Sequence, residues 1–407
     1  MNSKIIALAI LGVTAATVIL YPVDKTSGAV AVQTAVPPTQ AVTFQPVVTA
    51  TVHRPSIEVV FVLDTTGSMG GLIEAAKEKI WSIAATMASA QPAPEIKMGL
   101  VAYRDRGDAY VTRVVDLSAD LDSMYATLMD FQAEGGGDGP ESVNQALYDA
   151  IHRISWSQDP DSYRVVFLVG DAPPHMDYQD DVKYPVTMRA AVERGIVVNT
   201  IQCGDHAATG AQWLQIAQLT QGRHFQVEQA GSAVAIATPF DAKLARLSQE
   251  LDSTRLFYGN EEEKAKQKKK EQATAKLHAG ASLESRARRA AFNASASGST
   301  NLLGDRDLAA DVVNGKVDLS AVEAEQLPEP MQTMSRRDQK DLIVRIVAKR
   351  ADLQDQIREL SEQRGYYLDE RLEAAGGAED SLDYKVFSAI REQAAEKGLV
   401  YGDGPEY

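Results

Sequence analysis

Apolar and polar residues alternate along residues 56–240 in blocks that predict strands and helices in turn. Short, almost uninterrupted apolar runs are typical of strands buried on both faces, and the longer segments between them have a helical period. The expected strands are 57–63, 96–103, 110–117, 164–169, 196–203 and 224–227, and the expected helices are 72–90, 120–132, 141–154, 181–194, 211–220 and a long helix after residue 232. This order predicts an α/β domain, with a doubly wound, mostly parallel sheet and helices on both faces.

A charged helical segment is expected at residues 241–292. It contains an acidic run that leads into a lysine run at 261–270, and a basic cluster at 286–289. Acidic residues precede the lysines and aromatic residues are absent, so the pattern favours a solvated helix over a surface for nucleic acid or anionic lipid.

The remaining residues, 302–407, are expected to be mainly helical. Small polar residues at 293–301 predict a flexible break before them. Within the region, 338–372 carries apolar residues at intervals of seven, but the interleaved register includes Arg350 and Arg364. The pattern favours one amphipathic helix of a hairpin over a strong coiled coil.

The N-terminus carries an uncharged apolar run at residues 5–21, preceded by Lys4. This run predicts that residues 1–21 are a signal peptide or a retained signal anchor, and its length leaves both open. Residues 22–55 are rich in Pro, Thr and Val and predict an extended linker. Lys4 favours a cytoplasmic N-terminus, so the rest is expected to be exported, periplasmic or otherwise extracytoplasmic, with membrane contact only through the N-terminal segment.

Composition narrows the classes of function. The 407 residues include 56 acidic and 41 basic side chains, and the net charge of -15 gives no support for binding nucleic acid. The single cysteine, Cys203, excludes an internal disulfide and a cysteine-based zinc site. It lies in an apolar run, which favours a buried, inert thiol. The lack of disulfides favours a bacterial protein.

The sharpest chemical feature follows the first expected strand, where the chain reads Asp64-Thr65-Thr66-Gly67-Ser68. A buried strand brings Asp64 to the carboxyl edge of the sheet, where open α/β sheets bind their ligands. The turn after it brings the hydroxyls of Thr66 and Ser68 to the same side. Carboxylate and hydroxyl oxygens are the ligands that hard divalent cations prefer.

These residues resemble the von Willebrand factor A domain family, whose metal-ion-dependent adhesion site has the pattern Asp-x-Ser/Thr-x-Ser after the first strand. The resemblance covers residues 56–240 and implies a Rossmann-like fold with Mg²⁺, or Mn²⁺ or Ca²⁺, bound by side chains of three loops. Asp64, Thr66 and Ser68 match the first loop. Asp171, which ends the strand expected at 164–169, matches the aspartate of the third.

The middle loop departs from the family pattern. The family presents a threonine within a Gly-rich loop, whereas this chain reads Glu-Gly-Gly-Gly-Asp-Gly-Pro-Glu at 134–141. Asp138 is the candidate for the missing ligand. The alternative interpretation is that Asp138 caps the helix expected to begin near Glu141.

The resemblance implies a non-enzymatic module, in which an Asp or Glu of a partner protein completes the coordination of the ion. The expected function is metal-dependent protein binding, as an adhesion or scaffold module of the cell envelope. The partner would be a protein that presents a carboxylate, and no catalytic residue is expected. Residues 241–407 are not explained by the resemblance.

Two other classes of function stay open. A phosphoryl-transfer enzyme could use Asp64 as the aspartyl-phosphate nucleophile, because Asp64 to Ser68 is close to the Asp-Lys-Thr-Gly-Thr of P-type ATPases. Thr65 in place of the lysine weakens this hypothesis. A phosphatase of the haloacid-dehalogenase type would need an Asp at position 66 as its acid and base, and Thr66 cannot take that role. A structural assembly protein would instead act through the tail helices. The tripeptide Arg106-Gly107-Asp108 is interpreted as a polar loop, and His175 as an ordinary loop histidine.

Overall fold

The computed structural model describes residues 54–137, 139–229, 236–374 and 382–402. All of them belong to one compact unit, Pro46–Tyr407, while a second unit, Met1–Gln45, contains the expected export segment and lies outside the described residues. Within the described ranges, no helix is both long enough and apolar enough to cross a bilayer.

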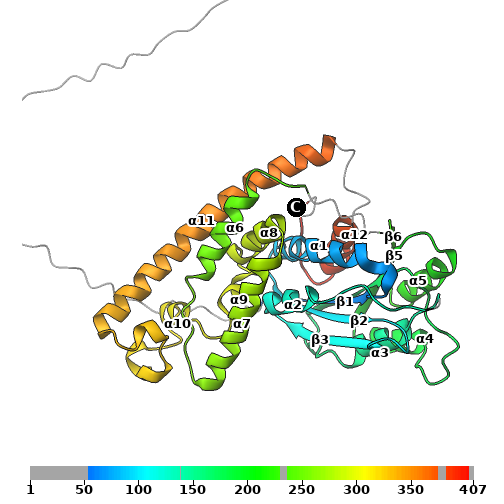
Figure 1. The fold of residues 1–407 in the computed structure, drawn as a ribbon, viewed down its shortest axis with the longest axis horizontal. Coiled ribbons are helices and arrows are strands. Elements are labelled where there is room, and N and C mark those ends of the chain that lie inside the picture. The colour runs from blue at the N-terminus through cyan, green and yellow to red at the C-terminus, as the bar shows by residue number, and fades with distance from the viewer. Residues whose placement is uncertain (1–53, 138, 230–235, 375–381, 403–407) are drawn as a thin grey trace, which may run out of the picture. The chain divides into compact units, whose positions relative to one another are not determined.

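The strands and helices up to residue 227 follow one another in the predicted order (Figure 1), whereas the long helix expected after residue 232 is a 12-residue helix that begins only at Asp241. The strands are β1 (Ser56–Asp64), β2 (Glu95–Tyr103), β3 (Thr112–Ser118), β4 (Tyr163–Gly170), β5 (Ile196–Cys203) and β6 (His224–Val227). The helices are α1 (Gly70–Ala88), α2 (Leu121–Leu128), α3 (Val143–His152), α4 (Tyr184–Glu193), α5 (Ala207–Leu219), α6 (Asp241–Asp252), α7 (Glu261–Gly280), α8 (Leu283–Ala294), α9 (Ser299–Leu303), α10 (Leu308–Val313), α11 (Arg336–Ala374) and α12 (Leu382–Ala395).

The strands form one sheet in the order β3-β2-β1-β4-β5-β6. The edge strand β3 is antiparallel to β2, and the other neighbours are parallel. The predicted fold class is therefore confirmed. The order along the sheet reverses between β1 and β4, and a crevice at such a reversal is where open α/β sheets bind ligands.

Each face of the sheet is covered by helices. On β1, the side chains of Ile57, Val59, Phe61 and Leu63 share a core with α1, α2 and α12. Val60 and Val62 point to the opposite face and share a core with α3, α4 and α5. This alternation explains why β1 reads as an unbroken apolar run, since both of its faces are buried.

The last helix, α12, completes the cover of the sheet although α6 to α11 separate it from β6 in the chain. It packs beside α1 (Figure 1), and Val386 and Ile390 join the core of that face. Gln393 accepts a hydrogen bond from Tyr163 of β4 at 2.6 Å and donates one to Asn199 of β5 at 2.8 Å. The compact unit that contains the sheet thus continues beyond residue 240, where the sheet domain is expected to end.

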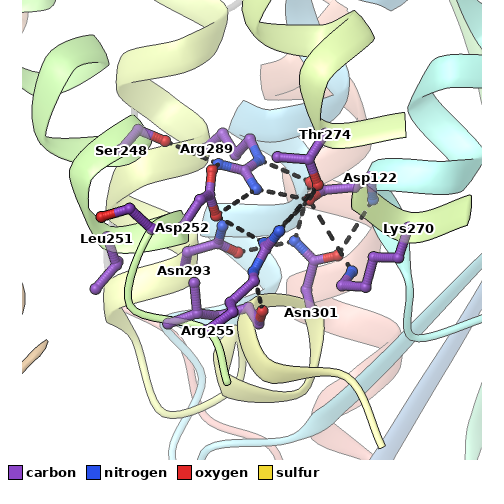
Figure 2. A network of polar contacts seen from close by, with 12 residues as sticks. Asp122, Ser248, Leu251, Asp252, Arg255, Lys270, Thr274, Arg289, Asn293 and Asn301 are labelled. Atoms are coloured by element: carbon purple, nitrogen blue, oxygen red, sulfur yellow. Dashed lines mark hydrogen bonds and ion pairs between the residues drawn. The ribbon is translucent and has the colours of Figure 1, made fainter. Parts of the chain in front are cut away.

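The charged segment also packs on the sheet domain, with α8 against α1 and α7 against α2. Figure 2 shows the polar network at this junction. Arg289 is fully buried and donates to both oxygens of Asp122, at 2.7 and 2.6 Å, and to Asp252 at 2.8 Å. Lys270 lies 2.5 Å from Asp120. The basic cluster and the lysine run therefore supply buried partners for acidic groups, in addition to the solvated residues expected there.

Residues 293–301 run from the end of α8 through a short turn into α9, where a flexible break was expected. Asn293 lies in the last turn of α8, Asn301 lies in α9, and both side chains are buried. The amide of Asn301 donates to Asn293 at 2.8 Å and to Asp122 at 3.3 Å. The polar side chains of Asn293 and Asn301 thus take part in the hydrogen-bond network around Asp122.

The long helix α11 packs against α6, α8 and α10. The register that includes Arg350 and Arg364 is buried, and Ile343 and Ile357 belong to it; Leu353 of the other register is buried as well. Arg350 donates to Asp307 at 3.0 and 3.1 Å, and Arg364 donates to Asp241 at 2.8 Å. Both arginines are buried because each has an acidic partner on the packed face.

Candidate metal centre

Asp64 ends β1 at the carboxyl edge of the sheet, and its side chain is fully buried. The backbone N–H and the hydroxyl of Thr66 both donate to Oδ1 of Asp64, at 2.9 and 2.7 Å. Ser68 follows in the 3-10 turn η1 (Gly67–Met69) and is exposed at the same edge. We call residues 64–70 the first metal loop.

Asp171 directly follows β4, the neighbour of β1, and is partly exposed. Its Oδ2 accepts a hydrogen bond from Gln229 at 2.7 Å, and its carbonyl accepts one from Thr209 at 3.0 Å. We call residues 171–183 the third metal loop. The ends of β1 and β4 thus bring Asp64 and Asp171 to one place, as the sequence predicted.

The electrostatics of Asp64 are unusual. Burial raises the pKa of Asp64 to about 7, and the charge of Asp171 adds to the rise, although the hydrogen bonds from Thr66 oppose it. Its Oδ2 makes no hydrogen bond of good geometry with the described residues, although the hydroxyl of Tyr103 lies close by and also lowers the pKa. An unpaired buried carboxylate is costly, and a nearby cation would favour the ionised form.

The residues present fit a hard divalent cation. Asp64 and Asp171 offer carboxylate oxygens, and Thr66 and Ser68 offer hydroxyls, which is the donor chemistry that Mg²⁺ takes together with water. In the ranges that the structure describes, no group of three or more His, Cys, Asp or Glu side chains is arranged to hold a metal. The donor set is therefore a mixture of carboxylates and hydroxyls.

The Gly-rich loop, residues 132–141, lies against the first metal loop. The N–H of Gly67 donates to the carbonyl of Gly135, and that of Glu134 donates to the carbonyl of Thr65, both at 3.1 Å. Asp138 itself lies outside the described residues, so its role as ligand or cap stays a prediction.

The end of the Gly-rich loop is joined to the third metal loop. The N–H of Glu141 donates to the carbonyl of Pro173 at 2.9 Å, and that of His175 donates to the carbonyl of Glu141 at 3.1 Å. The His175 ring is buried and stacked on Tyr178 with 3.9 Å between ring centroids. His175 therefore belongs to the packed surroundings of the site.

Sequence reasoning missed Asp105 and Asp108 in the loop between β2 and β3. Asp105 contacts the third metal loop, and Asp108 contacts the Gly-rich loop. A signal was available, because β2 is parallel to β1 and its carboxyl end reaches the same edge of the sheet. Asp64 and Asp171 were selected because they lie at the carboxyl ends of parallel strands, and the same criterion would also have selected Asp105 and Asp108.

Comparison with known proteins agrees with this architecture. Residues 58–235 match the family model of the von Willebrand factor A domain. The chain carries a von Willebrand factor A domain. Asp64, Thr66, Ser68 and Asp171 all lie within the matched part of this A domain.

Two relatives share this region. The chain is 31% identical over 121 residues to alpha-protein kinase vwkA of Dictyostelium discoideum, a match that covers 29% of this chain and 19% of the relative. It is 34% identical over 120 residues to von Willebrand factor A domain-containing protein 7 of Rattus norvegicus, covering 30% of this chain and 12% of the relative. The match thus spans less than a fifth of either relative.

Two solved structures are also similar to part of the chain. One is a von Willebrand factor type A protein from Catenulispora acidiphila, at 18% identity and a TM-score of 0.34, covering 44% of this chain and 40% of that one. Another is proximal thread matrix protein 1 from the mussel byssus, at 15% identity and a TM-score of 0.34, covering 43% and 42%.

Proposed function

We propose that the A domain binds a protein partner through a divalent cation at the carboxyl edge of its sheet. Mg²⁺ is the first choice, with Mn²⁺ or Ca²⁺ as alternatives. Asp64, Thr66, Ser68 and Asp171 would hold the ion, with Asp138 as a further ligand. The observation that carries the proposal is the fully buried Asp64 carboxylate, which has Asp171 close by and whose Oδ2 makes no hydrogen bond of good geometry with the described residues.

The residues of the chain have separate roles in this proposal. Thr66 orients Asp64 through two hydrogen bonds, and Gln229 orients Asp171. Ser68 is exposed and presents its hydroxyl at the surface that a partner would meet. The ion supplies positive charge that an Asp or Glu of the partner can bind.

The proposal is non-enzymatic, and the environment of Asp64 supports that choice. A phosphoryl acceptor must be reached by the phosphorus atom of its substrate, whereas Asp64 is fully buried and one of its oxygens accepts two hydrogen bonds. The apolar run at 5–21 supports an exported protein of the cell envelope.

A peptide selection tests the proposal directly. A random peptide library is selected on the immobilised chain in Mg²⁺ and eluted with EDTA, with Asp64→Ala as the control surface. We expect the eluted peptides to be enriched in Asp or Glu and to fail on Asp64→Ala. Enriched peptides that lack carboxylates, or that stay bound in EDTA, would contradict metal-bridged recognition.

A further inference from the structure

The loop between β2 and β3, residues 104–111, contacts all three loops of the metal centre. We propose that this loop is a clasp that positions those loops, with Asp108 and Asp105 as its main positioning residues. The inference rests on the proposed metal site for its functional meaning. The contacts that carry it are made within the chain and need no bound ion.

Arg104 joins the first metal loop to the start of the Gly-rich loop. Its Nε donates to the carbonyl of Thr65 at 3.2 Å, and its Nη2 donates to the carbonyl of Gln132 at 2.8 Å. The guanidinium is buried and lies 4.6 Å from the centroid of the Tyr110 ring. Arg104 thus fixes the carbonyl of Thr65, the residue directly before the proposed ligand Thr66.

Asp108 holds the Gly-rich loop from outside. Its carboxylate accepts from the N–H of Gly136 at 3.1 and 3.3 Å and from the N–H of Asp105 at 3.2 Å. Gly135 has a φ of 78°, and a Cβ atom there would lie 2.2 Å from Oδ1 of Asp108. Only glycine allows this approach without strain. The carbonyl of Gly135 in turn accepts from Gly67, so Asp108 positions the contact between two metal loops.

Asp105 joins the Gly-rich side of the site to the third metal loop. Its Oδ1 accepts from the hydroxyl of Ser142, just before α3, at 2.9 Å. Its Oδ2 accepts from the hydroxyl of Tyr178 at 2.9 Å and lies 3.4 Å from Nε2 of His175. Asp105 is 6% exposed, so these contacts are shielded from water.

Arg106 adds an outer contact to the third metal loop. Its guanidinium lies 2.9 Å from Asp180 and 2.6 Å from Asp181, and 4.1 Å from the centroid of the Tyr178 ring. Arg106 and Asp108, the charged residues of the Arg-Gly-Asp tripeptide, therefore both bind other loops of the same chain.

Mn²⁺ affinity tests the clasp, with Asp108→Ala compared with Asp116→Ala in the whole chain. Asp116 on β3 is a matched control, because it also accepts two backbone N–H groups, from Leu117 and Ser155 at 2.8 Å each. We expect Asp108→Ala to weaken Mn²⁺ binding by roughly tenfold or more, as loss of a group that orients metal ligands does. Asp116→Ala should leave the affinity within about twofold.

The conservative variant Asp108→Asn separates positioning from charge. It removes the negative charge but keeps an oxygen that can accept from Gly136, so it should recover most of the affinity lost in Asp108→Ala. If Asp108→Asn is as weak as Asp108→Ala, the effect is electrostatic and the clasp is overturned.

Hydrogen exchange in EDTA tests the clasp without any metal. Peptides that cover residues 64–70 and 132–141 should exchange faster in Asp108→Ala than in wild type, and at the wild-type rate in Asp116→Ala. Unchanged exchange in Asp108→Ala would overturn the clasp. If the wild type binds no Mn²⁺ but Asp108→Ala still exchanges faster than the wild type, the result would contradict the proposed function and support the clasp.

Discussion

Gly170 shows at the residue scale how close packing shapes the candidate metal centre. It is the last residue of β4, directly before Asp171. A Cβ atom at this position would lie 2.5 Å from the hydroxyl of Tyr103, 2.8 Å from Cβ of Asp64 and 3.0 Å from its Oδ2. The absence of a side chain at 170 therefore makes the room that the Asp64 carboxylate occupies.

The variant Gly170→Ala is expected to displace Asp64 and Tyr103. We expect a loss of about 1–3 kcal/mol in the free energy of unfolding, the usual cost of overpacking a core. Urea denaturation measures the loss. Gly137→Ala is the matched control, because a Cβ atom at 137 would meet nothing within 4 Å. Equal stability of the two variants would contradict this account.

The ligand candidates could be predicted from sequence because their signal is local. An apolar strand followed by Asp64, Thr66 and Ser68 specifies both the chemistry and its place at the sheet edge. The positions of Asp105 and Asp108 depend on a neighbouring strand and on glycines that are distant in sequence. Their contacts with Ser142, Tyr178 and Gly136 exist only after the loops have come together.

At the scale of elements, the network around Asp122 joins α2 to the helices that follow the sheet (Figure 2). Asp122 and Arg289 are both fully buried. Arg255 lies 2.6 Å from Asp252, and the hydroxyl of Thr274 donates to Asp122 at 2.8 Å. Removing one member leaves a buried charge without its partner, which costs more than the intact pair contributes.

The variant Asp122→Ala is expected to lower the free energy of unfolding by about 3–5 kcal/mol. Arg289 would keep only Asp252 as an acidic partner in a fully buried place. The control is Asp355→Ala, which breaks an exposed ion pair with Arg358 on α11 and should change stability by less than about 0.5 kcal/mol. Urea denaturation of both variants decides the matter, and similar midpoints would refute a structural role for the network.

Acid should weaken the same junction. Burial alone would raise the pKa of Asp122, but the charges of Arg289, Lys270 and Arg255 hold it well below its usual range. A carboxyl whose pKa is lowered by folding contributes stability that is complete above its unfolded pKa of about 4 and is lost as the pH falls toward the folded value. In EDTA, the stability difference between wild type and Asp122→Asn should therefore narrow below about pH 4. A constant difference from pH 7 to pH 3 would contradict the assignment.

The elements of the sheet were predictable, and the packing of the tail was not. Strand and helix periods are properties of short segments, so the fold class followed from them. Arg350 and Arg364 looked unsuited to a packed face, because their partners Asp307 and Asp241 are distant in sequence. Asn293 and Asn301 likewise suggested a break, since nothing in the local sequence shows that the Asn301 amide would donate a hydrogen bond to the distant Asp122.

At the scale of the whole described unit, the helices after residue 240 cover one face of the A domain. Leu277 of α7, Phe292 of α8 and Ile390 of α12 all join the core on the α1 face of the sheet. The bridge between Gln91 and Val400 ties the segment after α12 to the connection between α1 and β2. An A domain cut at 240 or 258 would expose this face.

A chain that ends at residue 374 should show how much α12 contributes. It loses Val386, Phe387, Ile390 and Leu399, which are all buried. Each such side chain contributes about 1.5–3 kcal/mol when buried, so the thermal midpoint should fall by at least about 10 °C. Circular dichroism measures the midpoint, with a chain that ends at residue 402 as the control. An unchanged midpoint would show that α12 is not part of the folded domain.

The central claim is that the carboxyl edge of the sheet binds a divalent cation through Asp64. The most direct measurement is calorimetric titration of Mg²⁺ and Mn²⁺ into the chelator-stripped whole chain at pH 8, above the Asp64 pKa of about 7. We predict one saturable site in the wild type that is lost in Asp64→Ala and retained in Asp116→Ala. Loss in Asp138→Ala as well would add that residue to the ligands. A folded wild type without saturable binding, or an Asp64→Ala variant of equal affinity, would contradict the claim.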